Sequence, residues 1–448
     1  MPTAAKSLRA SREPSGLRGE IAALSELAPV RAATGWLRRN PAEILRWQRE
    51  VCSIPAPPFG EAPRAAWLKE KLHALGLSES HIDEAGNVLA VFSHPHSAKK
   101  MSADQDCVAL IAHMDTVFPK GTAVNIRQEG KRLYGPGASD NGSGLAALMA
   151  LAAAMESAEL ELNAPVLFVC TVGEEGEGNL RGVRHLFLDS PWRERIACAL
   201  VVDGAGTENI VRQALGSRRF EVTLRGPGGH SWNDFGVPNP IAVMARAISD
   251  FYEAEDTRAG DIRVGDARRN PPRSAYNVGV IHGGVSVNSI PESAAMRVDL
   301  RSQTAAELDR MEAALRAVLA GALAHCESGV GRPRDDSQIS GARSKLSVEI
   351  RSIGDRPAAE LAAGARIGQV VRAVDAQLGI RARSHCSSTD ANLPLSLGRE
   401  ALSLGAGGSG GGAHTLGEWF DSAGRELGLE RLLLMTAALA GIGSGAKA

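Results

Sequence analysis

The sequence predicts an α/β protein with a mostly parallel central sheet and a smaller α+β domain inserted into it. Apolar, strand-like runs alternate with helical segments between residues 87 and 203, which is typical of a parallel sheet. After about Arg212 the predicted order becomes β-α-β-β-α-β, the pattern of a ferredoxin-like two-layer domain. At 448 residues the chain is also too long for one ordinary core.

The elements of the larger domain follow from local patterns. Residues 18–77 are helical in pattern, and Asn40 followed by Pro41 suits a helix start. Four apolar runs are predicted to be buried strands, at 87–92, 107–112, 166–172 and 199–202. The Gly-rich turn GPGASDNGSG (135–144) leads into a predicted helix. Further helices are expected at 358–378 and near 425–441.

Four segments of the chain are expected to differ in role. Residues 1–35 are predicted to be an N-terminal extension, and 36–212 the first part of the larger domain. Residues 213–355 form the predicted insertion, and 356–448 return to the larger domain. Alternation of apolar and polar residues at 220–224 indicates a strand with one solvated face, as an antiparallel two-layer domain requires.

Composition excludes several classes of protein. The formal net charge of −1 gives no support for a nucleic-acid or membrane partner, and aromatic residues make up only 4%. The six cysteines form no C-x-x-C pair and several lie in apolar runs, which favours a reducing compartment. The basic N-terminus lacks an apolar signal core, so we expect a cytoplasmic protein.

Metal-competent side chains follow three successive predicted strands. His113 and Asp115 end the run VALIAH, Glu174 and Glu175 follow VLFVCTV, and Asp203 follows ALVV. In a parallel sheet these side chains meet at one edge, and Asp140 in the Gly-rich turn can join them. So many carboxylates would repel each other without a cation, so a pair of divalent metals is predicted. Asp115 can orient His113 or bind metal itself, and one of the two glutamates can act as a free base.

Other polar residues complete the candidate site. His414 ends the loop GAGGSGGGAH, whose glycines allow close approach of backbone N–H groups to an anion, and we favour a ligand role over a flexible linker. His230, in GPGGHSW of the insertion, is a candidate hydrogen-bond donor to an oxyanion. Asn288 and Arg301 lie in the same domain, and Arg301 can bind a carboxylate through two hydrogen bonds.

Together these motifs resemble the M20 family of metallopeptidases and amidohydrolases, including peptidase T-like, carboxypeptidase G-like and deacylase members. The matching segments occur in family order over about residues 40–440: AHMDTVFP, GPGASDNGSG, VGEEGEG, VVDGAG, RGPGGHSW, the NSIP and DLR pair, STDANLPLSLG and GGGAHTLGEWF. Asn141-Gly142-Ser143-Gly144 replaces the Lys-Gly that many members carry there, and SSTDAN replaces a more Gly-rich version. These departures bear on substrate specificity.

The resemblance implies a role for each residue. His113 and Asp203 would hold one metal, Glu175 and His414 the other, and Asp140 would bridge both; the metals would be zinc, with manganese or cobalt as alternatives. Asp115 would brace His113, Glu174 would be the general base, and a cis peptide would follow Asp140. The insertion would be a dimerisation lid, and His230 would reach the partner's active site. Asn288, Arg301, Gly410, Gly411 and Gly412 would take the substrate carboxylate.

The resulting prediction is a homodimeric di-metal hydrolase of amide bonds that acts on short peptides with a free carboxylate. The alternative is a non-peptidase hydrolase of the same scaffold, acting on N-acyl, N-carbamoyl or aryl-amine substrates. A dinucleotide-binding oxidoreductase is disfavoured because neither Gly-rich turn gives G-x-G-x-x-G directly after a core strand. A non-catalytic scaffold is disfavoured because the metal ligands and the base are all present.

Overall fold

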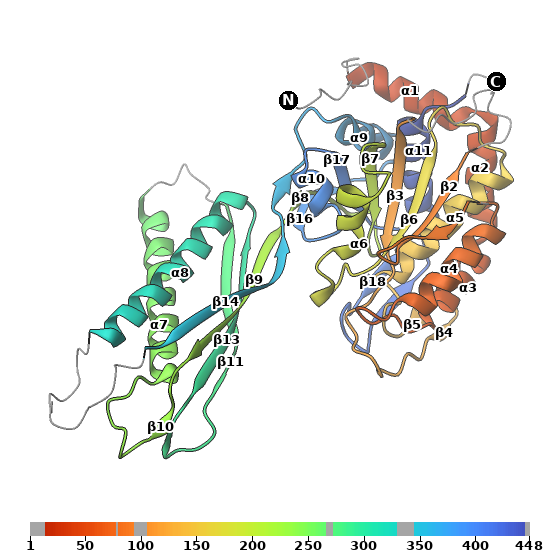
Figure 1. Ribbon diagram of the computed structural model, residues 1–448. Coiled ribbons are helices and arrows are strands. Elements are labelled where there is room, and N and C mark those ends of the chain that lie inside the picture. The colour runs from red at the N-terminus through yellow and green to blue at the C-terminus, as the bar shows by residue number, and fades with distance from the viewer. Residues whose placement is uncertain (1–13, 78, 94–104, 266–271, 329–344, 444–448) are drawn as a thin grey trace. The chain divides into compact units, whose positions relative to one another are not determined.

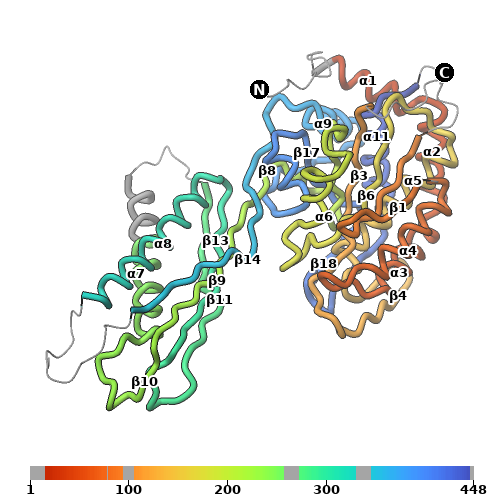
Figure 2. The backbone as a smooth tube through the Cα atoms, in the orientation of Figure 1, coloured from red at the N-terminus to blue at the C-terminus, as the bar shows by residue number. Residues whose placement is uncertain are grey.

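The computed structural model describes residues 14–77, 79–93, 105–265, 272–328 and 345–443, and it divides into two compact units (Figure 1). Unit 1 comprises Met1–Ala214 and Glu360–Ala448, and unit 2 comprises Leu215–Ala359. Figure 2 follows the chain through both units and shows that the late, blue segments of unit 1 lie among its early, red and yellow ones. Unit 1 is therefore built from segments that are distant in the sequence.

The centre of unit 1 is a nine-stranded sheet with the order β1-β2-β6-β3-β7-β17-β8-β15, with β16 also paired to β8. Its middle strands β6, β3, β7 and β17 are parallel, whereas β2 and β8 run antiparallel to their neighbours β6 and β17. The strands are β1 (His81–Ile82), β2 (Val88–Phe92), β3 (Cys107–His113), β6 (Val166–Thr171), β7 (Ile196–Val202), β8 (Asn209–Ala214), β15 (Ala359–Glu360), β16 (Arg383–Ser387) and β17 (Glu400–Leu404). The predicted α/β fold with a mostly parallel sheet is confirmed.

Helices cover the middle strands of this sheet. All seven residues of β3 are buried, so both of its faces are covered, because successive side chains point to opposite faces. Helices α5 and α11 pack against β3, α4 against β2, and α9 against β17. The helices of unit 1 are α1 (Pro14–Glu26), α2 (Ala28–Arg39), α3 (Pro41–Cys52), α4 (Ala62–Ala74), α5 (Gly142–Ser157), α6 (Arg181–Arg184), α9 (Arg366–Leu378), α10 (Asn392–Ser396) and α11 (Arg425–Ala440). No described helix is long and apolar enough to span a bilayer.

Two stretches of unit 1 differ from what local patterns indicate. Residues 1–13 lie outside the described residues, but α1 packs against α9 and α11, and α2 against α5 and α11, so these helices belong to the core of the unit. The helix expected over 358–378 begins only at Arg366. Before it, β15 joins the edge of the large sheet and the Leu361 N–H donates to the Arg212 carbonyl at 2.8 Å. Backbone pairing with a neighbouring strand outweighs the helix propensity of the alanines there.

Unit 2 is a two-layer α+β domain. Its antiparallel sheet has the order β11-β13-β9-β14, and α7 and α8 cover one face around buried residues such as Phe251, Met296 and Leu315. The elements are β9 (Gly216–Arg225), β10 (Gly229–His230), α7 (Pro240–Gly265), β11 (Ser274–Gly283), β12 (Ser289–Ile290), β13 (Ser293–Ser302), α8 (Ala305–Glu327) and β14 (Ser347–Arg356). The main elements follow the predicted β-α-β-β-α-β order.

A second small sheet in unit 1 positions part of the candidate site. Its order is β18-β19-β5-β4, formed by β4 (Arg127–Glu129), β5 (Arg132–Tyr134), β18 (Ser409–Gly411) and β19 (Trp419–Asp421). Gly410 pairs with Phe420 and Trp419 pairs with Tyr134, so β19 links the Gly-rich loop to β5, the strand that precedes the turn at 135–144. This sheet brings residues more than 270 positions apart into one neighbourhood.

Candidate metal centre

Three parallel strands end beside one another and carry the predicted ligands. Strand β3 lies between β6 and β7, and His113 at its end is in register with Thr171, the last residue of β6. Glu174 and Glu175 follow β6, and Asp203 directly follows β7. The carboxyl ends of parallel strands share one edge of a sheet, which is why these side chains meet.

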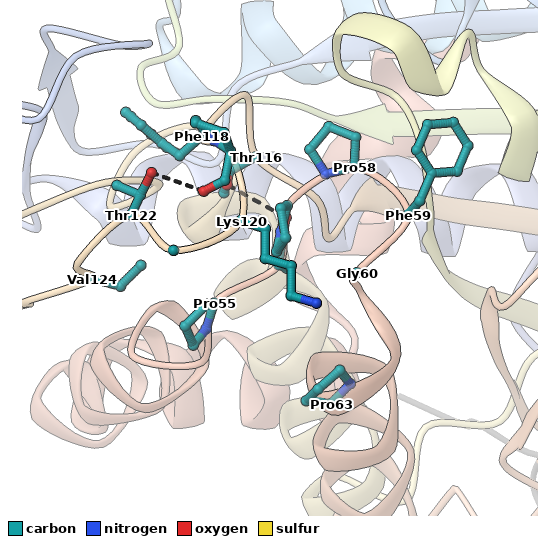
Figure 3. Close-up of a pocket in the computed structure, with 14 residues that line it drawn as sticks. Pro55, Pro58, Phe59, Gly60, Pro63, Thr116, Phe118, Lys120, Thr122 and Val124 are labelled. Atoms are coloured by element: carbon teal, nitrogen blue, oxygen red, sulfur yellow. Dashed lines mark hydrogen bonds between the residues drawn. The ribbon is translucent and has the colours of Figure 1, made fainter.

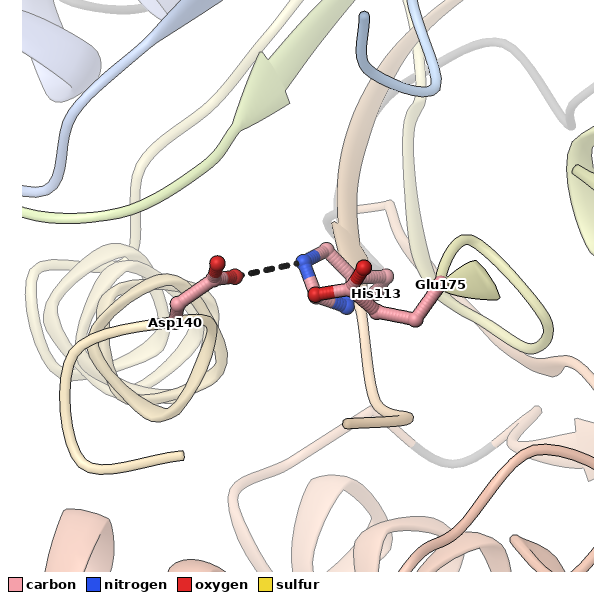
Figure 4. Close-up of side chains that lie close together, drawn as sticks. All are labelled: His113, Asp140 and Glu175. Carbon is pink, nitrogen blue, oxygen red and sulfur yellow. Dashed lines mark hydrogen bonds and ion pairs between the residues drawn. The ribbon is translucent and has the colours of Figure 1, made fainter. Parts of the chain in front are cut away.

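His113 contacts two predicted ligands through one ring nitrogen. Its Nε2 lies 3.0 Å from Asp140 Oδ1 and 3.7 Å from Asp203 Oδ1. Its Nδ1 lies 3.1 Å from the backbone carbonyl oxygen of Asp115. Figure 4 shows the imidazole of His113 facing the carboxylate of Asp140, with the Glu175 side chain reaching toward the same imidazole from the other side of the view. Nε2 is therefore the nitrogen that faces the cluster, while Nδ1 is engaged on the opposite side.

Asp115 supports the site from behind. Its side chain is fully buried, and its two carboxylate oxygens accept the backbone N–H groups of Glu174 at 3.0 Å and Glu175 at 2.7 Å. Asp115 Oδ1 lies 3.7 Å from His113 Nδ1. The carboxylate thus ties the end of β3 to the segment after β6, a geometry that suits a brace rather than a metal ligand.

Asp140 lies between the two histidines. Its Oδ1 is next to His113, and its Oδ2 lies 3.1 Å from His414 Nε2. His414 Nε2 is also 3.1 Å from Glu175 Oε1, although the His414 side chain is half exposed. Among the described residues, His113, Asp140 and Glu175 each bring a ligand atom within 4.8 Å of the others. Nitrogen and carboxylate donors at this spacing fit a zinc-like divalent cation.

The two histidines and the surrounding carboxylates shift one another's pKa values. Burial alone would lower the pKa of His113, but the carboxylates of Asp115, Asp140 and Asp203 raise it well above its usual value. Hydrogen bonds to Asp140 and Glu175 raise the pKa of His414 to about 10. Burial opposes ionisation of Asp140, yet both histidines hold its pKa well below the usual range. The site therefore demands positive charge, which a divalent cation can supply in place of these protons.

The turn that carries Asp140 is held by Asn141 and Glu418. The Asp140-Asn141 peptide is cis, as the family resemblance implies. Asn141 donates from Nδ2 to the Val202 carbonyl at 2.8 Å, and its Oδ1 accepts the N–H groups of Gly144 and Gly204. It thereby ties the start of α5 to the end of β7 beside Asp203.

Glu418 is a site residue that sequence reasoning missed. Its buried carboxylate accepts three backbone N–H groups, from Gly137 at 2.9 Å and from Ser139 and Asp140 at 2.7 Å each. Burial raises the pKa of Glu418 to about 7, against the opposing effect of these hydrogen bonds. One sequence signal could have indicated this role. Glu418 is an acidic residue between Gly417 and the aromatic pair Trp419-Phe420, in a segment that otherwise suits a buried strand.

Asp390 was also missed as an individual residue, although its segment STDAN is part of a family motif. Its side chain is buried, Oδ2 accepts a 2.5 Å hydrogen bond from Thr171 Oγ1, and Oδ1 has no hydrogen-bond partner among the described residues. Burial raises the pKa of Asp390 to about 6, and His113, Asp115 and Asp203 all act on it electrostatically. Asp390 is therefore a further buried acidic group that interacts electrostatically with the cluster.

The remaining predicted residues belong to β18, to the turn after it and to unit 2. Gly410 and Gly411 are in β18, and Gly410 packs so closely on Ser139 that a β-carbon there would overlap the Ser139 side chain. Gly412 has a positive φ of 70°. His230, Asn288 and Arg301 belong to unit 2, where Arg301 Nε donates to Asp299 Oδ2 at 2.7 Å. Their roles toward the cluster stay predictions.

The α/β fold and the cluster of metal-competent side chains at its strand ends are those of a metal-dependent enzyme. Comparison with known proteins identifies its family. Residues 109–440 match the model of peptidase family M20/M25/M40, and the chain belongs to that family. The resemblance inferred from the motifs is thus confirmed.

Individual relatives are more distant. The chain is 27% identical over 267 residues to a succinyl-diaminopimelate desuccinylase of Burkholderia cenocepacia, covering 56% of this chain and 66% of the relative, slightly less than two thirds of its length. An aminopeptidase structure from Bacillus cereus has a TM-score of 0.66 at 18% identity and covers 90% of this chain and 99% of its own. A Bacillus subtilis M20 family protein, described as a dinuclear metal-binding peptidase, has a TM-score of 0.62 at 14% identity, with 90% and 99% covered.

Proposed function

We propose that this protein is a di-metal hydrolase of amide bonds that acts on short peptides. The observation that carries the proposal is the placement of Asp140, whose two carboxylate oxygens each face a different histidine, at 3.0 and 3.1 Å. A carboxylate placed in this way suits a bridge between two cations. His113 and Asp203 would hold one ion, and Glu175 and His414 the other.

Zinc is our first choice of metal, with manganese or cobalt as alternatives, because the donors are imidazole nitrogens and carboxylate oxygens. When bound, the ions would supply Lewis acidity, which lowers the pKa of a coordinated water toward ~7 and polarises a carbonyl oxygen. Asp115 would keep His113 oriented and hold the backbone of Glu174 and Glu175 in place through its two hydrogen bonds.

Glu174 is proposed as the general base. The segment that carries it is anchored by Asp115, and its side chain is buried. It would accept a proton from the attacking water and return that proton to the leaving amine, as a carboxylate near the reacting atoms can do. The adjacent Glu175 faces His414 as a metal ligand would, so we assign proton transfer to Glu174.

His230 is proposed to stabilise the developing oxyanion from the lid of a partner subunit. Its Nδ1 accepts the backbone N–H groups of Trp232 at 3.2 Å and Asn233 at 3.4 Å. A neutral His230 would therefore carry its proton on Nε2, which is then free to donate outward. Asn288, Arg301 and the backbone of Gly410, Gly411 and Gly412 would bind the substrate carboxylate.

A homodimer formed through unit 2 is part of the proposal. Strand β11 is an edge of the unit 2 sheet, and its Val280 and Ile281 are 45% and 55% exposed. Val285 and Val287, in the loop that follows, are fully exposed. An apolar edge strand of this kind favours pairing with a second copy.

The six cysteines are all free, which supports a cytoplasmic location.

A non-peptidase amide hydrolase is the second candidate, and the desuccinylase relative favours it. The test is a substrate screen on protein that has been stripped of metal and reloaded with zinc, manganese or cobalt. We expect hydrolysis of di- or tripeptides only in the reloaded protein, at about two ions per chain. Cleavage of N-acyl or N-carbamoyl amino acids without peptide cleavage would favour the second candidate. Amide hydrolysis by the stripped protein would contradict both.

A further inference from the structure

Two loops of unit 1 line an open pocket that the proposed mechanism does not use. Its volume is about 570 Å³, within the range of small-ligand sites (Figure 3). One wall is the Pro-rich segment before α4, and the other follows β3. The lining comes from residues 55–63 and 116–124.

The walls of this pocket are stiff and nearly free of charge. Five of the lining residues are prolines, whose fixed φ limits the entropy that would be lost when a ligand binds. The two threonine hydroxyls already donate to backbone carbonyls, Thr122 to Pro119 at 2.8 Å and Thr116 to Ala56 at 3.4 Å. Lys120 is the one charged residue of the lining, and within the described chain no carboxylate pairs with it.

Lining residues of the pocket contact two segments that carry residues of the metal centre. Thr116 directly follows Asp115, and a β-carbon on Gly137, in the Asp140 turn, would come within 2.9 Å of Thr116 Cγ2. At the other end, the Phe59 ring lies 5.3 Å from the guanidinium of Arg181. Arg181 packs against Gly173, the residue directly before Glu174. A substrate group in this pocket would thus lie beside the segments that carry the brace and the base.

Arg181 does not compete with Lys120 for a ligand. It is paired with the buried Glu61 at 2.7 Å and also donates to the Ala85 carbonyl at 2.6 Å. Lys120 is exposed, and Figure 3 shows its side chain extending toward the Pro-rich segment, with its amine drawn between Pro55, Gly60 and Pro63. An ammonium group at the mouth of an apolar pocket favours a ligand with an apolar stem and a negative end.

We propose that this pocket binds the acyl side of the substrate and that Lys120 pairs with a carboxylate at the end of that group. The inference rests on the proposed amide hydrolysis and names its substrate class. The acyl group is either a dicarboxylic acid joined through one end or an acidic amino-acid residue. Gly410, Gly411 and Gly412 do not line this pocket, so this carboxylate is separate from the one expected at those glycines.

The test compares ligands that differ only in the terminal carboxylate. N-succinyl-leucine is matched with N-butyryl-leucine, and the dipeptide Glu-Leu with norvalyl-leucine. Binding is measured by calorimetry on the zinc-loaded Glu174→Gln protein, and turnover on the zinc-loaded parent. Lys120→Met removes the charge and keeps the length of the side chain, and Lys131→Met, at another exposed lysine of unit 1, is the matched control.

We expect the acidic member of at least one pair to bind ten-fold or more tightly than its neutral partner. Lys120→Met should abolish that preference and leave the neutral ligand within about two-fold, and Lys131→Met should change neither. A preference in the succinyl pair alone indicates a dicarboxylic acyl group, and one in the dipeptide pair alone indicates an acidic residue. Equal binding within both pairs, or a preference that survives Lys120→Met, overturns the inference. A preference in binding without turnover of any ligand overturns the proposed hydrolysis and leaves the pocket assignment standing.

Discussion

In unit 1, acidic side chains lie buried where parallel strands end, whereas in unit 2 aliphatic side chains lie exposed at and beside one edge strand. Asp115, Glu174, Glu175 and Asp390 are all at most 7% exposed, while Val280, Ile281, Val285 and Val287 are at least 45% exposed. Both arrangements are unfavourable for an isolated chain in water. The difference is the one that the proposal requires, in which cations would complete unit 1 and a second copy of the chain would complete unit 2.

The largest expected effect is on catalysis at the buried edge of unit 1. Glu174→Gln keeps the size of the side chain but removes its ability to accept a proton. We expect turnover to fall by about 10³-fold, as for loss of a general base, with both metals retained. Metal content by elemental analysis and kcat on the preferred substrate measure this. Near-normal turnover in the variant would show that another group is the base.

A second test of the comparison between buried and exposed groups removes a buried charge that is paired with another side chain of the same protein. Arg431 is fully buried, and its Nε and Nη2 each donate to an Asp375 oxygen at 2.7 Å, which joins α11 to α9. Arg431→Met leaves Asp375 without its partner, and we expect a loss of ~3–5 kcal/mol in the free energy of unfolding. Arg38→Met, at the exposed pair with Glu430, is the control and should cost at most ~1 kcal/mol. Denaturant titration compares the two, and equal losses would contradict the role of burial.

Asp390 links the stability of the metal-free protein to pH. Its pKa is raised from 3.8 to about 6 by burial, so the folded state binds its proton more tightly than the unfolded state does. The stability that this proton contributes is complete below about pH 4 and is lost as pH rises to about 6.

Asp390→Asn removes this ionisation. We compare the free energies of unfolding of the variant and the parent in chelator-treated protein. The difference in favour of the variant should be larger at pH 8 than at pH 4 by up to ~3 kcal/mol, since one pKa unit corresponds to 1.36 kcal/mol. Thermal or denaturant unfolding at both pH values measures this gain. A difference between the two proteins that does not change with pH would contradict ionisation of Asp390 in this range.

Removing the His113 imidazole and removing the Asp115 carboxylate that braces it should have different effects on metal binding. His113→Ala removes a ligand, and we expect one of the two ions to be lost. Asp115→Ala removes only the brace, so both ions should bind, with affinity about 10–100-fold weaker at one site. Titration with a competing chelator measures both variants. Loss of an ion in Asp115→Ala with full retention in His113→Ala would reverse the two assignments.

The smallest expected effect concerns the exposed edge of unit 2. Ile281→Lys places a charge on β11, and we expect self-association to weaken by at least about ten-fold with the fold intact, because an edge lysine disfavours strand pairing. Val348→Lys, on the opposite edge strand β14 with Val348 39% exposed, is the matched control. Sedimentation at several concentrations distinguishes the two edges. A parent protein that is monomeric at every concentration would contradict the proposed dimer and leave the exposed valines without a partner surface.

Much of the fold and most of the candidate ligands follow from sequence patterns. His113, Asp203 and the Glu174–Glu175 pair are readable because each follows an apolar run that is long enough to be a buried strand. His414 and Asp140 are expected in the cluster because each lies at a Gly-rich turn in family order, and the structure brings both to within 3.1 Å of a neighbouring ligand. The helix expected from 358 failed at its start because strand pairing is not encoded in local propensity.

The sequence by itself determined the alternation of strands and helices, the change to an antiparallel insertion, and the kinds of side chain that end each strand. These are short-range properties, set by the periodicity of apolar residues and by turn-forming glycines. Only the tertiary structure decided that Glu418 accepts three N–H groups of a turn about 280 residues earlier, that Asp390 accepts a hydrogen bond from Thr171, and that Lys120 borders a proline-walled pocket. Each of those contacts depends on how segments that are distant in the sequence pack together, and no local pattern of residues specifies that packing.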